Sequence, residues 1–119
     1  MVAQELNKET FEQKVAVVES FPEGWIFKGD KPCIVDFYTS WCSYCRSLAI
    51  ILDQLANEYD GVVNVYKVNI EENECFEKVF HIQMVPQLLF CCPNKTPYMK
   101  LGTMNKNKIK QIIDSNLFG

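Results

Sequence analysis

Apolar residues along this chain follow two spacings, one typical of buried strands and one typical of amphipathic helices. Residues 33–38 and 62–69 form short apolar runs, as expected for strands that are covered on both faces of a sheet. Between them, apolar side chains recur at helical spacing over residues 43–59, and Gly61 provides a stop. The pattern therefore predicts a strand–helix–strand unit whose two strands lie parallel.

The N-terminal part of the chain predicts a short strand, a helix and a loop. We expect the strand within residues 1–6. Thr10 and Gln13 have the spacing of a capping box, which predicts a helix that opens there and ends near Val18. Residues 21–32 are punctuated by glycine and proline, and this composition predicts a loop.

The C-terminal part predicts a helix, a β-hairpin and a last helix. We expect the first helix over residues 72–80, and the hairpin from strands at 88–92 and 97–101 joined by a turn at 93–95. The last helix carries an apolar stripe of Ile109, Ile112, Ile113 and Leu117. This order of elements predicts an α/β fold with a mixed sheet, parallel through the crossovers and antiparallel at the end.

Composition limits the classes of protein that this chain can belong to. Its 119 residues predict one domain, residues 1–119, and an apolar fraction of 48% suits a sizeable core. The net charge of −3 gives no reason to expect a nucleic acid or an anionic membrane as partner. No apolar run approaches the roughly 18 residues that a transmembrane helix needs.

The first nine residues are polar and do not resemble a signal peptide. As printed, the sequence therefore predicts a cytoplasmic protein. If Met1 is a start placed after a removed export signal, we expect a periplasmic or exported protein instead.

A Cys-x-x-Cys pair, Cys42 and Cys45, stands where the first long strand passes into the long helix. A helix N-terminus presents unpaired N–H groups and the positive end of the helix dipole, and both stabilise a thiolate on Cys42. The thiolate is the nucleophile of thiol–disulfide exchange, and Cys45 is close enough to close a small disulfide ring. The pair therefore predicts a dithiol that cycles between reduced and oxidised forms.

A structural zinc site is the other chemistry that two cysteines suggest. Zinc usually takes four ligands, and this chain offers one histidine, His81, to which we assign no catalytic role. Cys91 and Cys92 make a poor second pair, because neighbours on a strand point to opposite faces. We therefore expect no metal and no cofactor.

The chain holds six cysteines in all, and we interpret the remaining four as small buried apolar residues without a redox role. These are Cys33, Cys75, Cys91 and Cys92.

Asp36 interrupts the apolar strand that leads to the Cys-x-x-Cys pair. A buried carboxylate is costly unless it is paired or protonated, so we expect burial to raise the pKa of Asp36. An aspartate that reaches water or a backbone donor at the end of the strand is the alternative.

Five motifs follow one another along the chain: Val35-Asp36-Phe37-Tyr38, Trp41-Cys42 with Cys45, Val65-Tyr66-Lys67-Val68-Asn69, Val85-Pro86, and Gly102 before the last helix. Taken together, these motifs resemble the thioredoxin family, and they cover almost the whole chain in the order and spacing of that family. The resemblance implies a thioredoxin fold, with a central mixed sheet of about four to five strands and about four flanking helices.

The resemblance also implies the activity, a thiol–disulfide oxidoreductase that reduces or exchanges protein disulfides. Cys42 matches the attacking cysteine and Cys45 the one that resolves the mixed disulfide. Asp36 matches the acid that relays protons to Cys45, and Lys67 matches the lysine that tunes this acid. Disulfide-containing client proteins and a reductase or other thiol reductant would be the partners of a monomer.

The same resemblance implies a docking patch for clients. Pro86 matches a proline with a cis peptide bond, and Val85 matches the residue whose backbone pairs with an extended client segment. Trp41, Gly102 and Thr103 would complete an apolar patch around Cys42.

Ser43 and Tyr44 stand between the two cysteines, where most thioredoxins carry Gly-Pro. Unlike proline, Tyr44 has a backbone N–H at the helix start, which should further stabilise the thiolate. We therefore expect a reduction potential less negative than about −270 mV, the value for ordinary thioredoxin.

Two other functions stay open at this point. The Cys-Ser-Tyr-Cys and Val-Pro-Gln sequences also resemble glutaredoxins, which exchange disulfides with glutathione. Some glutaredoxin-like proteins hold an iron–sulfur cluster between two subunits at such a site, so a cluster-binding module is the second alternative.

Overall fold

The computed structural model describes residues 2–117, and the side chains of residues 2–115. Its centre is a five-stranded mixed sheet in the order β1-β3-β2-β4-β5. β1, β3 and β2 run parallel, whereas β4 is antiparallel to both β2 and β5. The strands are β1 (Gln4–Glu5), β2 (Cys33–Tyr38), β3 (Asn64–Asn69), β4 (Gln87–Cys91) and β5 (Tyr98–Leu101). The predicted mixed sheet is confirmed.

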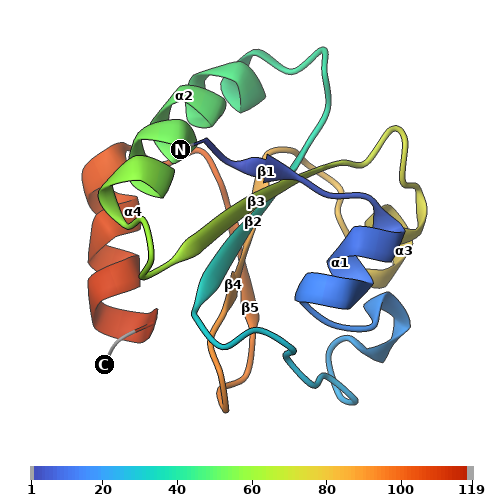
Figure 1. Ribbon diagram of the computed structural model, residues 1–119. Helices are drawn as coiled ribbons and strands as arrows, with labels where there is room; N and C mark the ends of the chain where they lie inside the picture. The colour runs from blue at the N-terminus through green and yellow to red at the C-terminus, as the bar shows by residue number, and fades with distance from the viewer. Residues whose placement is uncertain (1, 118–119) are drawn as a thin grey trace.

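Helices cover both faces of this sheet, so the described chain has three layers (Figure 1). α2 and α4 lie on one face, and α1 and α3 lie on the other. The helices are α1 (Lys8–Lys14), α2 (Ser43–Glu58), α3 (Cys75–Val79) and α4 (Lys106–Ile112), with a 3-10 turn η1 (Val18–Ser20) and a π-helical end η2 (Ile113–Leu117). None of the described helices is long and apolar enough to cross a membrane.

On the face of α1 and α3, the core is built from aromatic rings. Phe11 of α1 meets Phe76 of α3 edge-to-face, with ring centroids 4.9 Å apart. Phe80 stacks obliquely on Phe37 of β2 at 5.1 Å. Each such pair adds about 0.5–1.5 kcal/mol beyond the area it buries. These contacts hold the two short helices against the central strand.

On the other face, the apolar stripe of α2 packs on the sheet. Leu48, Leu52 and Leu55, at the helical spacing noted in the sequence, are buried with Ile34 of β2 and Phe90 of β4. Ile109, Ile112 and Ile113 of the last helix belong to the same core, whereas the side chain of Leu117 lies outside the described residues. This packing sets the N-terminus of α2 over the carboxyl end of β2.

The N-terminal helix does not open as the sequence predicted. Its N-cap is Asn7, whose Oδ1 accepts from Thr10 N–H at 2.9 Å, while Thr10 Oγ1 accepts from Asn7 N–H at 2.9 Å. The predicted capping box of Thr10 and Gln13 was therefore wrong, and the helix opens three residues earlier. Threonine is the partner of the cap rather than the cap itself, because asparagine is the stronger cap and precedes it.

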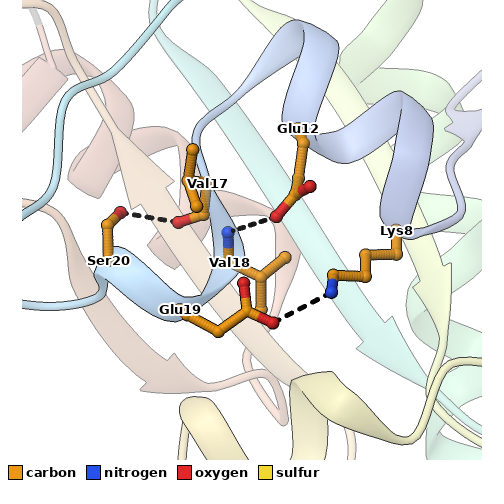
Figure 2. Close-up of polar contacts among 6 residues, drawn as sticks. All are labelled: Lys8, Glu12, Val17, Val18, Glu19 and Ser20. Atoms are coloured by element: carbon orange, nitrogen blue, oxygen red, sulfur yellow. Dashed lines mark hydrogen bonds and ion pairs between the residues drawn. The ribbon is translucent and has the colours of Figure 1, made fainter.

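The helix also ends before Val18. The carboxylate of Glu12 accepts from Val18 N–H at 2.9 Å, and this bond starts the separate turn η1 (Figure 2). Ser20 Oγ donates to the Val17 carbonyl at 2.6 Å, and Lys8 pairs with Glu19 at 2.9 Å (Figure 2). The bend after α1 is thus held by side chains that hydrogen-bond to backbone groups in place of a continued helix. The spacing of apolar residues does not reveal this competition.

Other boundaries differ by a few residues. The strand predicted at 62–69 begins at Asn64, and the helix predicted at 72–80 begins only at Cys75. The first strand is confined to two residues, and Met1 lies outside the described residues. The predicted turn at 93–95 is confirmed, with Asn94 at φ 64° and Lys95 N–H donating to the Cys92 carbonyl at 3.2 Å.

The corrected cap makes a direct stability prediction. Replacing Asn7 by alanine should lower the free energy of unfolding by about 1 kcal/mol, because it leaves Thr10 N–H without its acceptor. Gln13→Ala is the matched control on the exposed side of the same helix and should change stability by less than about 0.5 kcal/mol. Urea unfolding of both variants checks this. An equal or larger loss in Gln13→Ala would contradict the assigned cap.

Candidate active site

Cys42 is the N-cap residue of α2, with extended backbone angles of φ −87° and ψ 119°. Its Sγ accepts a hydrogen bond from Cys45 N–H at 3.2 Å and lies 3.8 Å from the Val85 carbonyl oxygen. Cys42 is the more exposed of the pair, at 7% against 3% for Cys45. One sulfur therefore faces both a helix N-terminus and the neighbouring loop.

The donor to Cys42 Sγ is the N–H of Cys45, a group that any residue at position 44 leaves in place. The expected effect of Tyr44 on the thiolate thus depends on the field at the helix start rather than on this bond. The expected shift in reduction potential stays a prediction.

The loop between β2 and α2 is held by an acidic residue that the sequence analysis missed. Ser40 donates twice to Glu71 Oε1, through its N–H at 2.8 Å and its Oγ at 3.0 Å. Arg46 Nη1 donates to the Ser40 carbonyl at 3.4 Å. Since β2 and β3 are parallel, Glu71 after β3 comes to the same edge of the sheet as Ser40 after β2. The parallel pairing of the two strands was the signal from which the contact between Glu71 and Ser40 could have been predicted.

Cys45 is more deeply buried than Cys42, and its thiol is protonated at neutral pH. Burial, and then the hydrogen bond with Cys42, raise the pKa of Cys45 to about 12. Asp36 contributes to this rise through its negative charge, which places it within electrostatic reach of Cys45. At neutral pH, Cys45 therefore needs a base before it can act as a nucleophile.

Asp36 lies in the middle of β2 and is 2% exposed. Burial raises its pKa to about 7, Lys67 opposes the rise, and Glu5 adds to it. Among the described residues, Asp36 Oδ1 has no hydrogen-bond partner. A buried carboxyl with this pKa exchanges its proton near neutral pH, as a general base must. The expected rise in pKa is confirmed.

Lys67 lies directly beside Asp36 in the β2–β3 register, next to the acid with which the family resemblance associated it. Its Nζ also sits 6.0 Å from the centre of the Tyr38 ring, within the range of a cation–π contact. Tyr38 in turn donates its hydroxyl to Glu5 Oε1 at 2.6 Å. Glu5 thus joins the surroundings of Asp36, a contribution from β1 that sequence spacing did not indicate.

The loop from Val85 to Pro86 faces Cys42 and has the expected cis peptide bond. The Pro86 carbonyl accepts from Gly102 N–H at 2.7 Å, which draws the end of the hairpin to the site. A Cβ on Gly102 would lie 2.9 Å from Leu48 Cδ2 and 3.1 Å from Pro86 Cγ. Only glycine therefore allows this close approach. Gly102 is itself buried, and Thr103 beside it is exposed.

A cavity of about 450 Å³ opens beside Cys42, lined by the loop of Val85 and by the start of α2. Trp41, Tyr44 and Met84 line it and are largely exposed, at 69%, 67% and 62%. A smaller cavity of about 160 Å³ lies on the other side of Tyr44, against Gly102 and Thr103. Exposed apolar side chains gathered at a groove are typical of a protein-docking surface.

The remaining cysteines lie elsewhere in the fold. Cys33 and Cys91 are buried in the core, and Cys75 and Cys92 are partly exposed. His81 is exposed and has a positive φ of 53° after α3. Within the part of the chain that the structure describes, no cluster of three or more histidine, cysteine or acidic side chains is placed to bind a metal ion.

Comparison with known proteins agrees with this geometry. The family model named thioredoxin matches residues 2–115. The thioredoxin of Borreliella burgdorferi is 31% identical over 114 residues, which cover 96% of each chain. The thioredoxin of Buchnera aphidicola subsp. Acyrthosiphon pisum is 34% identical over 113 residues, covering 95% of this chain and 94% of the relative.

Among solved structures, chloroplastic thioredoxin z matches with a TM-score of 0.81 and 27% identity, covering 100% of this chain and 97% of the other. The fold class predicted from the sequence is confirmed.

Burial of Asp36 predicts a pH-dependent stability. Its pKa is about 7 in the folded chain against 3.8 as the ordinary value, so the unfolded state loses this proton first as pH rises. Wild type should therefore lose stability relative to Asp36→Asn between pH 4 and pH 7, by about 4 kcal/mol in full. Urea unfolding of both proteins from pH 4 to pH 8 measures the difference. A difference that does not vary with pH would contradict the buried acid.

Packing around Gly102 predicts a second stability effect. Gly102→Ala should destabilise the protein by about 1–3 kcal/mol, because the new methyl group overpacks the Pro86 ring. The matched control is Gly24→Ala, whose new Cβ would meet its nearest atom, the Ser20 carbonyl oxygen, at 3.4 Å, an ordinary contact. Thermal unfolding of the two variants separates them. Equal melting temperatures would show that the loop tolerates a side chain.

Proposed function

The chain belongs to the thioredoxin family, and from that premise we propose how its own residues carry out thiol–disulfide exchange. The protein is a thiol–disulfide oxidoreductase that acts on disulfide-containing substrates and takes electrons from a reductant. The observation that carries the proposal is the position of Cys42 Sγ, at the N-terminus of α2 and facing the Val85 carbonyl.

In the first step, the Cys42 thiolate attacks one sulfur of a client disulfide. A new sulfur–sulfur bond forms, and the other client sulfur leaves as a thiolate that takes up a proton. The Cys45 N–H bond and the dipole of α2 support the charge on Cys42 before the attack. The product is a mixed disulfide between Cys42 and the client.

In the second step, Cys45 resolves the mixed disulfide. Because its pKa is about 12, it must give up its proton to a base. Asp36, with a pKa of about 7, is the buried group suited to accept it, and Lys67 and Glu5 adjust that pKa in opposite directions. The Cys45 thiolate then attacks Cys42 Sγ and expels the client sulfur. The client gains two electrons, and Cys42 and Cys45 are left as a disulfide.

We propose that clients dock in the groove beside Cys42. The exposed side chains of Trp41, Tyr44 and Met84 supply apolar contact. The backbone of Val85 would pair with an extended client segment, which brings the scissile disulfide to the sulfur by a short strand addition. Gly102 would hold this loop in place rather than touch the client, since it is buried against Pro86 and Leu48. Thr103 would border the groove.

The site needs no metal or cofactor in this proposal. The reductant that restores the dithiol is proposed to be a reductase or another thiol reductant. We further propose that the protein acts as a monomer, in the cytoplasm or, if an export signal is removed ahead of Met1, in the periplasm or outside the cell. A glutaredoxin-like or cluster-binding role is not favoured, because the family model and the relatives are thioredoxins.

Trapping of a client tests the order of attack. Cys42→Ser and Cys45→Ser should each reduce the rate of insulin-disulfide reduction by dithiothreitol to that of dithiothreitol alone. Only Cys45→Ser should retain a covalent client adduct, because it keeps the attacking sulfur and lacks the resolving one.

Cys75→Ser is the control, since it removes a partly exposed thiol that does not line the groove, and it should keep wild-type activity. An adduct on Cys42→Ser, or turnover by either active-site variant, would refute the assignment.

A further inference from the structure

A second pair of cysteines meets in the core, away from the groove. Cys33 at the start of β2 lies directly opposite Cys91 at the end of β4 in the antiparallel register. Both side chains are buried, and both are free thiols in this structure. The sequence analysis interpreted them separately, as small apolar residues, because residues far apart in the chain reveal no pairing by their spacing.

The two thiols share one face of the sheet. Both belong to the core on the side of α1 and α3, together with Val35 of β2 and Leu89 of β4. Burial, and then a hydrogen bond with Cys91, raise the pKa of the Cys33 thiol. The two thiols therefore lie close enough to interact, and the raised pKa keeps Cys33 protonated at neutral pH.

The backbone spacing suits a covalent bond between them. Residues directly opposite in an antiparallel pair have Cα atoms about 4.5–5.5 Å apart, depending on the hydrogen-bonding pattern. Disulfides accept Cα separations of about 4.4–6.8 Å, so either pattern falls within the range. The neighbouring Cys92 packs against the core on the other face of the sheet. It is therefore directed away from Cys33.

We propose that Cys33 and Cys91 are a second dithiol, which hydrogen peroxide oxidises to a disulfide across β2 and β4. When the protein opens to solvent, one thiol gives up its proton and its sulfur attacks a peroxide oxygen; the O–O bond breaks, a sulfenic acid forms, and the leaving hydroxide takes up the proton to become water. The other sulfur attacks the sulfenic sulfur, the S–S bond forms and a second water leaves. The two thiols lose two electrons and peroxide gains them, so Cys42 and Cys45 take no part.

The position of this bond gives it a structural effect. The same two strands carry the active site at their other end, where Phe37 pairs with Gln87 directly after the Pro86 loop. A Cys33–Cys91 bond would close a loop that contains all of α2, β3 and α3. It would constrain the unfolded chain and so stabilise the fold. Because both sulfurs are buried, external thiols would reach the bond only when the protein opens.

The test uses the full chain with four other cysteines replaced, Cys42→Ser, Cys45→Ser, Cys75→Ser and Cys92→Ser. After peroxide treatment, we expect loss of both thiols on titration in denaturant and an intact mass lower by two hydrogens. The melting temperature should rise by at least about 5 °C. Dithiothreitol should restore the thiols in denaturant and leave the bond intact in the folded protein.

The matched control keeps Cys33 and Cys92 and replaces Cys91 by alanine, with Cys42, Cys45 and Cys75 changed to serine as before. Like the test variant, this control has two thiols, and they are only one residue farther apart in the sequence. Cys33 and Cys92 lie on opposite faces of the sheet, so no disulfide should form between them. The proposal would be overturned if the folded test variant kept both thiols after peroxide treatment. It would also be overturned if the intact mass showed added oxygen without the loss of two hydrogens. Equal cross-linking in the control would overturn it as well.

The natural six-cysteine protein provides a measurement that does not depend on the folding of these variants. After peroxide treatment, cleavage between Cys33 and Cys42 should release a peptide of Cys33 joined to one of Cys91. A bond between Cys91 and Cys92 in its place, or no bond from Cys33, would contradict the proposal. The proposal does not rest on the catalytic mechanism, since Cys42 and Cys45 are absent from the test variant.

Discussion

Burial of the central strand β2 on both faces and both edges is the constraint on which the rest of the structure depends. β3 and β4 pair with its two edges, while the aromatic core of α1 and α3 and the leucine stripe of α2 cover its faces. The strand is therefore fixed in register, and its residues from Cys33 to Phe37 are buried. A shift by one residue would move every side chain to the opposite face. The loop after β2 and the first turn of α2 are consequently held in a fixed position.

This constraint accounts for the chemistry of the site. The helix α2 begins shortly after β2 ends, so Cys42 lies at the helix N-terminus, where the Cys45 N–H donates to its sulfur. Asp36 within the strand has no access to water, and its pKa rises to about 7 for that reason first. The parallel neighbour β3 contributes Lys67 beside Asp36, and the antiparallel neighbour β4 begins at the loop that faces Cys42. One buried strand thus organises the proposed nucleophile, the proposed base and the loop that is proposed to dock clients.

The features predicted well from the sequence are those that depend on local spacing. The strand Cys33–Tyr38 was predicted with its observed bounds, and the helix predicted at 43–59 ends one residue earlier, at Glu58. The errors fall where side chains compete for backbone groups, as Asn7 and Glu12 do around α1. Glu5 and Glu71 were missed because their partners, Tyr38 and Ser40, come from distant segments. Sequence spacing carries no information on such contacts until the sheet order is known.

The same strand pair sets two dithiols in opposite environments. At one end, Cys42 lies at a helix N-terminus beside a groove, where we propose that a client disulfide docks. At the other end, Cys33 and Cys91 lie opposite each other in the apolar core, where burial raises the pKa of the Cys33 thiol. The rate of thiol–disulfide exchange depends on the fraction of thiolate and on how easily a reaction partner reaches the sulfur. Two pairs of cysteines in one protein can therefore react at different rates. A protein can therefore hold an exchanging pair and a slowly oxidised pair on one sheet, because solvent access separates them more effectively than distance along the strand.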